Sequence, residues 1–196
     1  MWRQKLATFI GQYEHPGWGI AHSERVYELA LELAKQQDIS VDQDALLAAA
    51  YLHDVGALDP YKQEGVDHAE RSAALANESL IYAGFPPNKM PLVKEIILGH
   101  MFYAERPTLI EAVVFRDANT LDFLGAIGVA RILASVGLDD QTPNMQKAVS
   151  LLQRFSRELP GTLLTRPAKR IGKVRQAEMQ SFLAALSNET DKLGNL

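Results

Sequence analysis

The chain contains no cysteine among its 196 residues, which excludes disulfide bonds, thiolate metal sites and a cysteine nucleophile. It also lacks any apolar run of about 20 residues, the length that a helix needs to cross a bilayer. At the N-terminus the apolar residues are spaced along one face of a helix, unlike the continuous apolar segment of a signal peptide. These absences lead us to expect a soluble, cytoplasmic protein without a membrane partner.

Excess positive charge is also missing. The chain has 20 basic and 24 acidic residues, which give a net charge of -4 at pH 7. Because proteins bind a phosphate backbone through a basic surface, we expect no nucleic acid partner. A small anionic ligand would need local positive charge from a metal ion or a few basic side chains. The densest basic stretch, residues 166–175, is typical of a solvated helix face, and its alternative is a rim that attracts an anionic substrate.

Helical periodicity runs through most of the chain, whereas no segment shows the alternation of a half-buried strand. We therefore predict an all-α fold with about eight helices. The predicted helices span residues 2–14, 19–37, 42–54, 67–84, 89–103, 107–135, 144–158 and 168–188, and the segment 107–135 is a candidate for two helices because it contains two glycines. With 47% hydrophobic residues, the chain can fill the core of a single domain over residues 1–196.

Polar side chains interrupt the apolar faces of several predicted helices. Apolar residues follow His22, and precede His53, His100 and Asp117, at steps of three and four. Asp54 follows His53 at the predicted end of a helix, where two successive side chains can point to one place. An unpaired buried carboxylate is very costly, so these inward-facing groups must meet something cationic. A metal ion would satisfy all of them.

Histidine and carboxylate ligands without thiolates suit hard or borderline divalent ions. We therefore expect one or two ions of Mn, Fe, Mg, Co, Ni or Zn as the cofactor. Four protein ligands leave an octahedral ion room for water and for a substrate oxygen. Such an ion can lower the pKa of bound water toward about 7 and polarise a phosphoryl oxygen. The residues thus favour attack of a metal-activated water on phosphorus.

The order His…His-Asp…Asp on helices resembles the HD-domain superfamily of metal-dependent phosphohydrolases. His22, the doublet His53-Asp54 and Asp117 carry this resemblance. A closer similarity to the small stand-alone bacterial HD hydrolases comes from three runs: Asp67–Ala73, Gly99-His100 and Asp117–Gly128. The resemblance spans roughly residues 15–135. It implies a metal-site core in that region, with the helices of residues 144–188 packed on it.

By this resemblance, one metal ion would be held by His22, His53, Asp54 and Asp117. Two further histidines, His68 and His100, lie where binuclear members hold a second ion. They would either bind that ion, with Asp54 as the bridge, or donate hydrogen bonds to a substrate phosphate around a single ion. Asp54 would also take the proton of the attacking water, so the expected catalytic residues are Asp54, His68 and His100.

Three basic residues are candidates for binding the substrate phosphate. Arg25 and Arg71 each lie three residues after a candidate ligand histidine, and Lys62 follows the doublet. Surface salt bridges are the alternative role for Arg25. Lys62 is considered because Ala57 occupies the position where many HD proteins carry a lysine. The subfamily usually has an aspartate at the position of Asn119, where this chain keeps an oxygen acceptor but lacks the negative charge.

The implied activity is hydrolysis of a phosphomonoester or a nucleotide, which makes the protein an enzyme with a small phosphorylated substrate. Two alternatives stay open. A di-iron oxygenase occurs on the same fold and would contain iron that changes redox state and consumes oxygen. A non-catalytic regulatory module that binds a metal and a nucleotide is favoured only by the change at Asn119. A homodimer is common among helical enzymes of this size.

Overall fold

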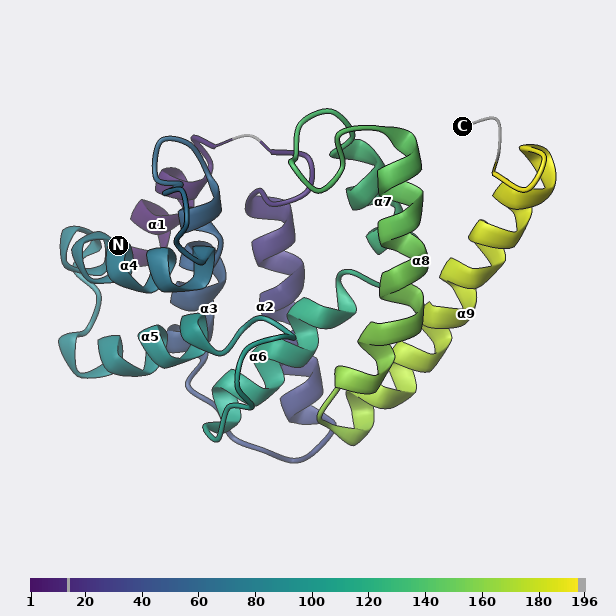
Figure 1. Cartoon of the computed structure of the whole chain (residues 1–196). Coiled ribbons are helices and arrows are strands. Elements are labelled where there is room, and N and C mark those ends of the chain that lie inside the picture. Colours follow the sequence, from purple (N-terminus) through teal and green to yellow (C-terminus); the bar gives the residue numbers. More distant parts are fainter. Residues whose placement is uncertain (14, 194–196) are drawn as a thin grey trace. The chain divides into compact units, whose positions relative to one another are not determined.

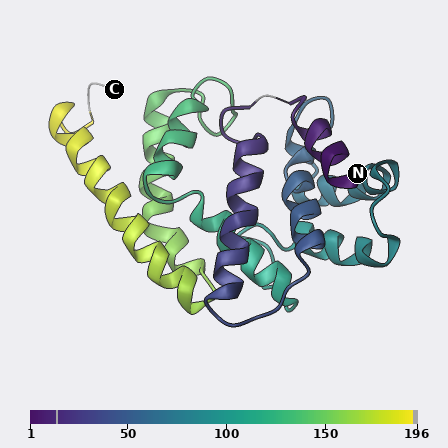
Figure 2. The same cartoon turned by 180° about the vertical axis from the view of Figure 1, so that it is seen from behind.

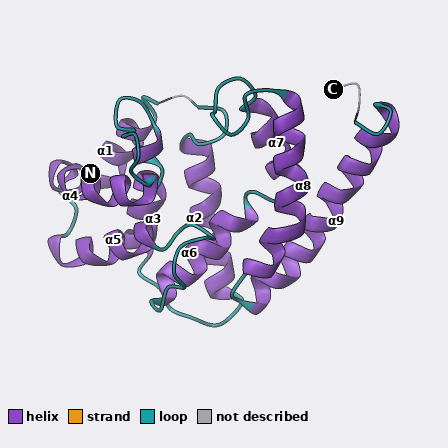
Figure 3. Ribbon diagram, viewed as in Figure 1, coloured by secondary structure: helices purple, strands orange, loops and turns teal. Residues whose placement is uncertain are grey.

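All regular structure in the described chain is helical. The computed structural model describes residues 1–13 and 15–193. Within them lie nine α-helices, two 3-10 helices and no strand, so the predicted all-α class is confirmed (Figure 1, Figure 3). None of the described helices is both long and apolar enough to cross a membrane. The chain divides into a compact unit over Met1–Asn119 and a second unit that begins at Thr120; the expected single domain over residues 1–196 stays a prediction.

The first unit contains the elements that carry the candidate ligands. They are α1 (Trp2–Ile10), α2 (Ile20–Lys35), α3 (Gln43–Leu52), the 3-10 helix η1 (Val55–Ala57), α4 (His68–Ala83), the 3-10 helix η2 (Pro87–Lys89), α5 (Met90–Leu98) and most of α6 (Ile110–Leu121). The helix predicted over residues 89–103 ends at Leu98. Beyond it, carbonyl groups of the next loop accept hydrogen bonds from the Arg116 side chain of α6 instead of from helix amides.

Helix α3 forms the centre of the first unit. Asp42 caps it by accepting a hydrogen bond from the Ala45 amide at 3.0 Å, and every residue from Ala45 to Leu52 is buried. Helices α1, α2, α4 and α5 all pack on it (Figure 1, Figure 2). A helix that is covered on all sides must be apolar all round, and the small alanines allow the neighbours to approach closely. The doublet His53-Asp54 therefore emerges inside the unit.

The second unit contains α7 (Gly125–Ala134), α8 (Met145–Thr162) and α9 (Arg166–Glu189), which pack on one another in pairs. The predicted segment 107–135 divides into α6 and α7 at Gly125, whose φ of 71° lies in the left-handed region that favours glycine. The predicted helix 168–188 begins earlier, because the Thr165 hydroxyl caps it by accepting from the Ala168 amide at 3.3 Å.

Polar side chains of the second unit are used structurally. Arg131 and Asp122 form a buried ion pair at 2.7 Å. The Arg131 guanidinium also lies 4.9 Å from the ring centroid of Phe123. In the basic stretch 166–175, the side chains of Arg166, Lys169, Arg170 and Lys173 are exposed, as expected of a solvated helix face.

Candidate metal centre

The first cluster of ligand atoms joins α2 to the end of α3. The Nε2 atoms of His22 and His53 lie 3.2 Å apart. Asp54 Oδ2 lies 3.5 Å from His22 Nε2 and 3.2 Å from His53 Nε2. We call these three residues the first triad. Because His53 caps α3 and Asp54 has already left the helix, the two successive side chains reach the same point.

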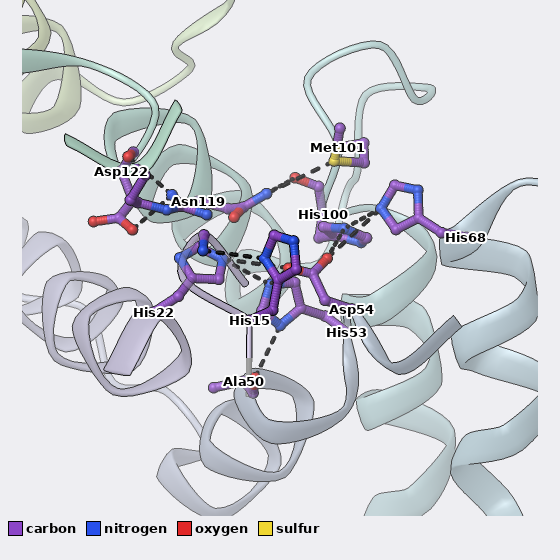
Figure 4. A network of polar contacts seen from close by, with 12 residues as sticks. His15, His22, Ala50, His53, Asp54, His68, His100, Met101, Asn119 and Asp122 are labelled. Atoms are coloured by element: carbon purple, nitrogen blue, oxygen red, sulfur yellow. Dashed lines mark hydrogen bonds and ion pairs between the residues drawn. The ribbon is translucent and has the colours of Figure 1, made fainter. Parts of the chain in front are cut away.

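A second cluster uses the other oxygen of the same carboxylate. Asp54 Oδ1 lies 3.7 Å from His68 Nε2 and 3.6 Å from His100 Nε2. The two histidine Nε2 atoms are 3.2 Å apart. We call Asp54, His68 and His100 the second triad; Figure 4 shows the four histidines of both triads converging on Asp54. One oxygen of Asp54 thus faces each pair of histidines.

Backbone carbonyl groups fix the protonation of two imidazoles. His53 Nδ1 donates to the Ala50 carbonyl at 2.9 Å, and His100 Nδ1 donates to the Ile97 carbonyl at 2.6 Å. A carbonyl oxygen can only accept, so the proton of each neutral ring resides on Nδ1. Each Nε2 then presents a lone pair toward Asp54. This is the arrangement of metal-ligating histidines, whose second nitrogen usually donates to a carbonyl or a carboxylate.

The spacing of the ligand atoms fits a metal ion in each triad. Nitrogen and oxygen ligands lie about 2.0–2.2 Å from a zinc-sized ion, so neighbouring ligand atoms on one ion are separated by roughly 3.0–3.7 Å. The observed separations within the two triads run from 3.2 to 3.7 Å. The chain is therefore compatible with divalent metal binding.

The candidate centre is open on one side. His22, His53 and His100 are buried, whereas the side chains of Asp54 and His68 are 12% and 24% exposed. The two histidines of the first triad are therefore closed off from solvent, and the second triad is reachable through His68.

The protonation states of Asp54 and His68, on the open side of the centre, favour binding of a cation. Burial of Asp54 opposes its ionisation, but its interactions with the surrounding His53, His100 and His22 side chains outweigh burial and hold the pKa of this carboxyl well below its usual range. Burial lowers the pKa of the His68 imidazole, although Asp54 acts in the opposite direction. An ionised carboxylate beside a neutral imidazole is the protonation state that metal binding requires.

These shifts predict how pH affects the metal-free protein. His68 binds a proton more weakly when folded than when unfolded, so its contribution to stability is present above about pH 6.5 and is lost as pH falls below that value. We expect chelator-treated protein to lose up to about 1.4 kcal/mol of unfolding free energy per pH unit through this residue. Urea unfolding between pH 8 and 5 measures the slope, and His68→Gln should flatten it. An unchanged slope in His68→Gln would contradict the assignment.

Gly56 allows the doublet to lie against the start of α4. A Cβ atom added at Gly56 would stand 2.5 Å from the His68 carbonyl oxygen and 2.7 Å from the Ser72 amide nitrogen. The Gly56 amide donates to Ser72 Oγ at 2.8 Å, which fixes the contact. This close approach brings Asp54 and His68 into one cluster.

Gly56→Ala is therefore expected to be strongly destabilising. The added methyl group meets backbone atoms, which cannot rotate away, so we expect a loss of about 3 kcal/mol of unfolding free energy and weaker metal binding at the second triad. Gly161→Ala is the matched control, because nothing lies within 4 Å of a Cβ atom there and alanine suits a helix. Thermal unfolding of both variants checks the prediction; similar melting temperatures would contradict it.

Asp117, the last predicted ligand, is fully buried on α6. Among the described residues, neither triad includes it. The neighbouring Arg116 turns to the loop between α5 and α6, where its Nη1 atom donates to the Ala104 and Glu105 carbonyls at 3.0 and 3.1 Å. The Arg116 guanidinium therefore binds the carbonyl groups of this loop. The role of Asp117 as a ligand stays a prediction.

The predicted phosphate-binding residues have different surroundings. Arg71 is half-buried on α4, and its Nε atom donates to the Tyr61 carbonyl at 2.9 Å. Arg25 is half-buried on α2, and Lys62 is exposed in the loop before α4. Their contact with a substrate stays a prediction. Asn119 is buried, and its Nδ2 atom donates to the His100 carbonyl at 3.4 Å, a bond that an aspartate carboxylate could not donate.

Two groups near the centre are difficult to find from sequence. The His15 ring stacks on Trp18 with centroids 5.9 Å apart, and the Trp18 and His22 rings form a T-shaped pair with centroids 6.3 Å apart. His15 is drawn with the ligand network in Figure 4. His15 lies in a Pro-Gly loop, which indicates a solvated residue. The Tyr103 hydroxyl donates to Asp67 Oδ2 at 2.8 Å, and no periodic pattern pairs residues so far apart.

Comparisons with known proteins agree with this geometry. The HD domain family model matches residues 19–124. A predicted HD superfamily hydrolase from an uncultured Thermotogales bacterium has 25% sequence identity, covers 96% of this chain and 90% of its own, and gives a TM-score of 0.64. No curated protein matches the sequence.

Two further solved structures share the fold. A Lactobacillus plantarum protein has 24% identity and a TM-score of 0.69, with 96% of each chain covered. Bacillus subtilis YpgQ in complex with ADP has 23% identity and a TM-score of 0.68, with 95% of this chain and 97% of that chain covered. The solved structures that it resembles are those of small stand-alone bacterial proteins. Because the HD domain match extends over more than half of the sequence and includes both triads, the chain belongs to the HD-domain family.

Proposed function

We propose that the protein is a metal-dependent phosphohydrolase that cleaves a phosphomonoester or a nucleotide. The observation that supports this most strongly is the position of Asp54. Its two oxygens face two separate pairs of histidine Nε2 atoms at 3.2–3.7 Å. A carboxylate shared in this way suits two ions about 3.5–4 Å apart, as in hydrolases that transfer phosphoryl groups to water.

The residues divide into two ligand sets. His22, His53, Asp54 and Asp117 would hold the inner ion, and Asp54, His68 and His100 would hold the outer one. When bound, such ions acidify a water molecule and polarise a phosphoryl oxygen of the substrate. The set contains only imidazole and carboxylate ligands, which suits Mn, Fe, Co, Ni, Zn or Mg.

The side chains of the centre would divide the remaining tasks. Asp54 is ionised at neutral pH, so it can accept a hydrogen bond and then the proton of the attacking water. Solvent, which reaches the centre on the His68 side, can then take the proton from Asp54. If only the inner ion binds, His68 would instead donate a hydrogen bond to the phosphate. His100 could donate from Nε2 only as the doubly protonated imidazolium, because its Nδ1 proton is bonded to the Ile97 carbonyl.

Basic residues on the open side would bind the substrate phosphate. Arg71 lies three residues after His68, and the bond from its Nε atom to the Tyr61 carbonyl orients the guanidinium. Its Nη atoms can then form paired hydrogen bonds with phosphoryl oxygens. Arg25 and Lys62 are the weaker candidates for the same role. Arg71→Lys should therefore raise KM more than it lowers kcat, since a lysine cannot form the paired bonds.

A nucleotide is the substrate class that we favour. The structure of the related YpgQ contains ADP, which shows that a protein of this fold can bind a nucleotide. In this chain, the stacked pair His15 and Trp18 lies next to His22 and offers an aromatic surface for a base.

A substrate panel tests this function. Chelator-treated protein reloaded with Mn, Fe, Co, Ni, Zn or Mg would be incubated with phosphomonoesters and with nucleoside mono-, di- and triphosphates, and the released phosphate or pyrophosphate would be measured. We expect metal-dependent release that EDTA abolishes. Oxygen consumption by the iron form without phosphate release would indicate an oxygenase. Nucleotide binding without turnover by any metal form would indicate a regulatory module.

A further inference from the structure

One hydrogen bond links the two chain segments that carry the histidines of the second triad. The Tyr103 hydroxyl donates to Asp67 Oδ2 at 2.8 Å. His68 follows Asp67 directly, and His100 lies three residues before Tyr103. The bond therefore connects the start of α4 to the loop that follows α5, close to both ligand positions.

The Asp67 end of this bond is rigid with respect to His68. Asp67 is the N-cap of α4, and its Oδ1 atom accepts from the Ala69 amide at 2.8 Å. The carboxylate thus holds the backbone on both sides of His68 with one oxygen and Tyr103 with the other. Any displacement of Tyr103 that preserves the bond moves the first turn of α4.

The Tyr103 end is rigid with respect to His100. Arg116, buried on α6, donates hydrogen bonds to the carbonyls of Phe102, Ala104 and Glu105 on both sides of Tyr103. Asn119 on the same helix donates to the His100 carbonyl at 3.4 Å. Residues 100–105 are therefore fixed to α6 as one piece, with His100 and Tyr103 both attached to it.

His68 has the greatest need of such a restraint. Its side chain is 24% exposed, whereas that of His100 is fully buried. Moreover, the proton on His100 Nδ1 leaves its Nε2 atom as an acceptor, so once both Nε2 atoms face an ion no direct bond can hold the two rings together. The bond between Tyr103 and Asp67 supplies a connection outside the ligand set.

We propose that Tyr103 is a positioning residue of the second triad, which sets the separation between His68 and His100 and thereby the affinity for the outer divalent ion. The inference rests on the proposed function, because it assumes that the triads bind metal. It assigns a role to a residue that touches neither an ion nor the reacting atoms. Tyr103 acts through Asp67 and the backbone of His68.

Tyr103→Phe removes the hydrogen bond to Asp67 and keeps the aromatic ring. The ring is 56% exposed and meets Phe102 edge to face with centroids 5.3 Å apart, so phenylalanine preserves its packing and removes only the hydroxyl. Any stacking of the ring on a substrate base would also survive. Tyr82→Phe is the matched control, because Tyr82 lies on α4 with its side chain 75% exposed.

The experiment is a calorimetric titration of chelator-treated full-length protein with Mn²⁺, run beside thermal unfolding of the metal-free forms. We expect the parent and Tyr82→Phe to bind two ions. We expect Tyr103→Phe to bind the inner ion with unchanged affinity and the outer ion at least about tenfold more weakly, the effect of losing one hydrogen bond to a charged group. Without metal, it should unfold in one cooperative transition well above the temperature of the titration, so that weaker binding does not reflect loss of folding.

A double-mutant cycle separates positioning from general loosening. If the bond itself matters, the double variant Tyr103→Phe/Asp67→Asn should lose less binding free energy for the outer ion than the sum of the losses in the two single variants. Additive effects, or two ions bound by Tyr103→Phe as tightly as by the parent, would overturn the inference and leave the hydrolase proposal intact. A parent protein that binds one ion would also overturn it. A parent that binds no ion would instead defeat the proposed function, on which the inference rests.

Discussion

Asp54→Asn is expected to lower metal-dependent phosphate release on the order of 10³-fold and to abolish tight binding of divalent ions. Asp54 is the only residue shared by the two triads, and its oxygens lie 3.2–3.7 Å from four histidine nitrogens. An asparagine keeps one oxygen but turns an NH₂ group toward the other histidine pair. It also removes the negative charge that offsets the charge of the ions.

The effect can be separated from loss of folding. Asp38→Asn is the matched control, because Asp38 is an exposed residue with a φ of 56°, a conformation that asparagine also tolerates. Both variants should show the helical circular dichroism of the parent, while only Asp54→Asn fails to retain metal after dialysis. Parent-like metal content and turnover in Asp54→Asn would remove Asp54 from the centre.

Arg131→Met is expected to cause the largest loss of stability, about 3–5 kcal/mol of unfolding free energy. The Arg131 guanidinium donates to both the carboxylate and the carbonyl of Asp122, at 2.7 and 2.9 Å, and both side chains are buried. Removal of the arginine takes away both of these hydrogen bonds and the positive charge that faces a buried carboxylate. Loss of such a buried pair is far more costly than loss of a surface ion pair.

Urea unfolding with a matched set of variants measures this effect. Arg154→Met removes an exposed arginine of α8 and should change the unfolding free energy by less than about 0.5 kcal/mol. Adding Asp122→Leu to Arg131→Met should recover most of the loss, because an apolar pair can replace a buried ion pair. A loss below about 1 kcal/mol in Arg131→Met would show that the pair contributes little.

The all-α class could be predicted from sequence because helix faces repeat in a period that apolar residues report directly. The errors lie at boundaries. The end of α5 at Leu98 depends on Arg116, a residue of the next helix, which bonds the carbonyls that a longer helix would have used. A local pattern contains no information about a partner so distant along the chain.

His22, His53 and His100 could be predicted because each replaces an apolar residue on a buried face. Asp54 could be predicted because it follows His53 at the end of a helix, and His68 from the resemblance to the HD-domain superfamily. The structure brings His22, His53, Asp54, His68 and His100 together. The contacts that place these ligands could not be predicted. Gly56 matters through its distance to α4, and Tyr103 through a bond to Asp67, and neither depends on periodicity.

The measurement that tests the account most directly is elemental analysis of protein purified without chelators or metal-affinity resin. The two triads predict about one or two equivalents of Mn, Fe, Co, Ni or Zn per chain in the parent and a near-complete loss in Asp54→Asn. Protein that contains no metal, and takes up none after incubation with Mn²⁺ or Fe²⁺, would contradict the metal centre and the hydrolase function proposed from it.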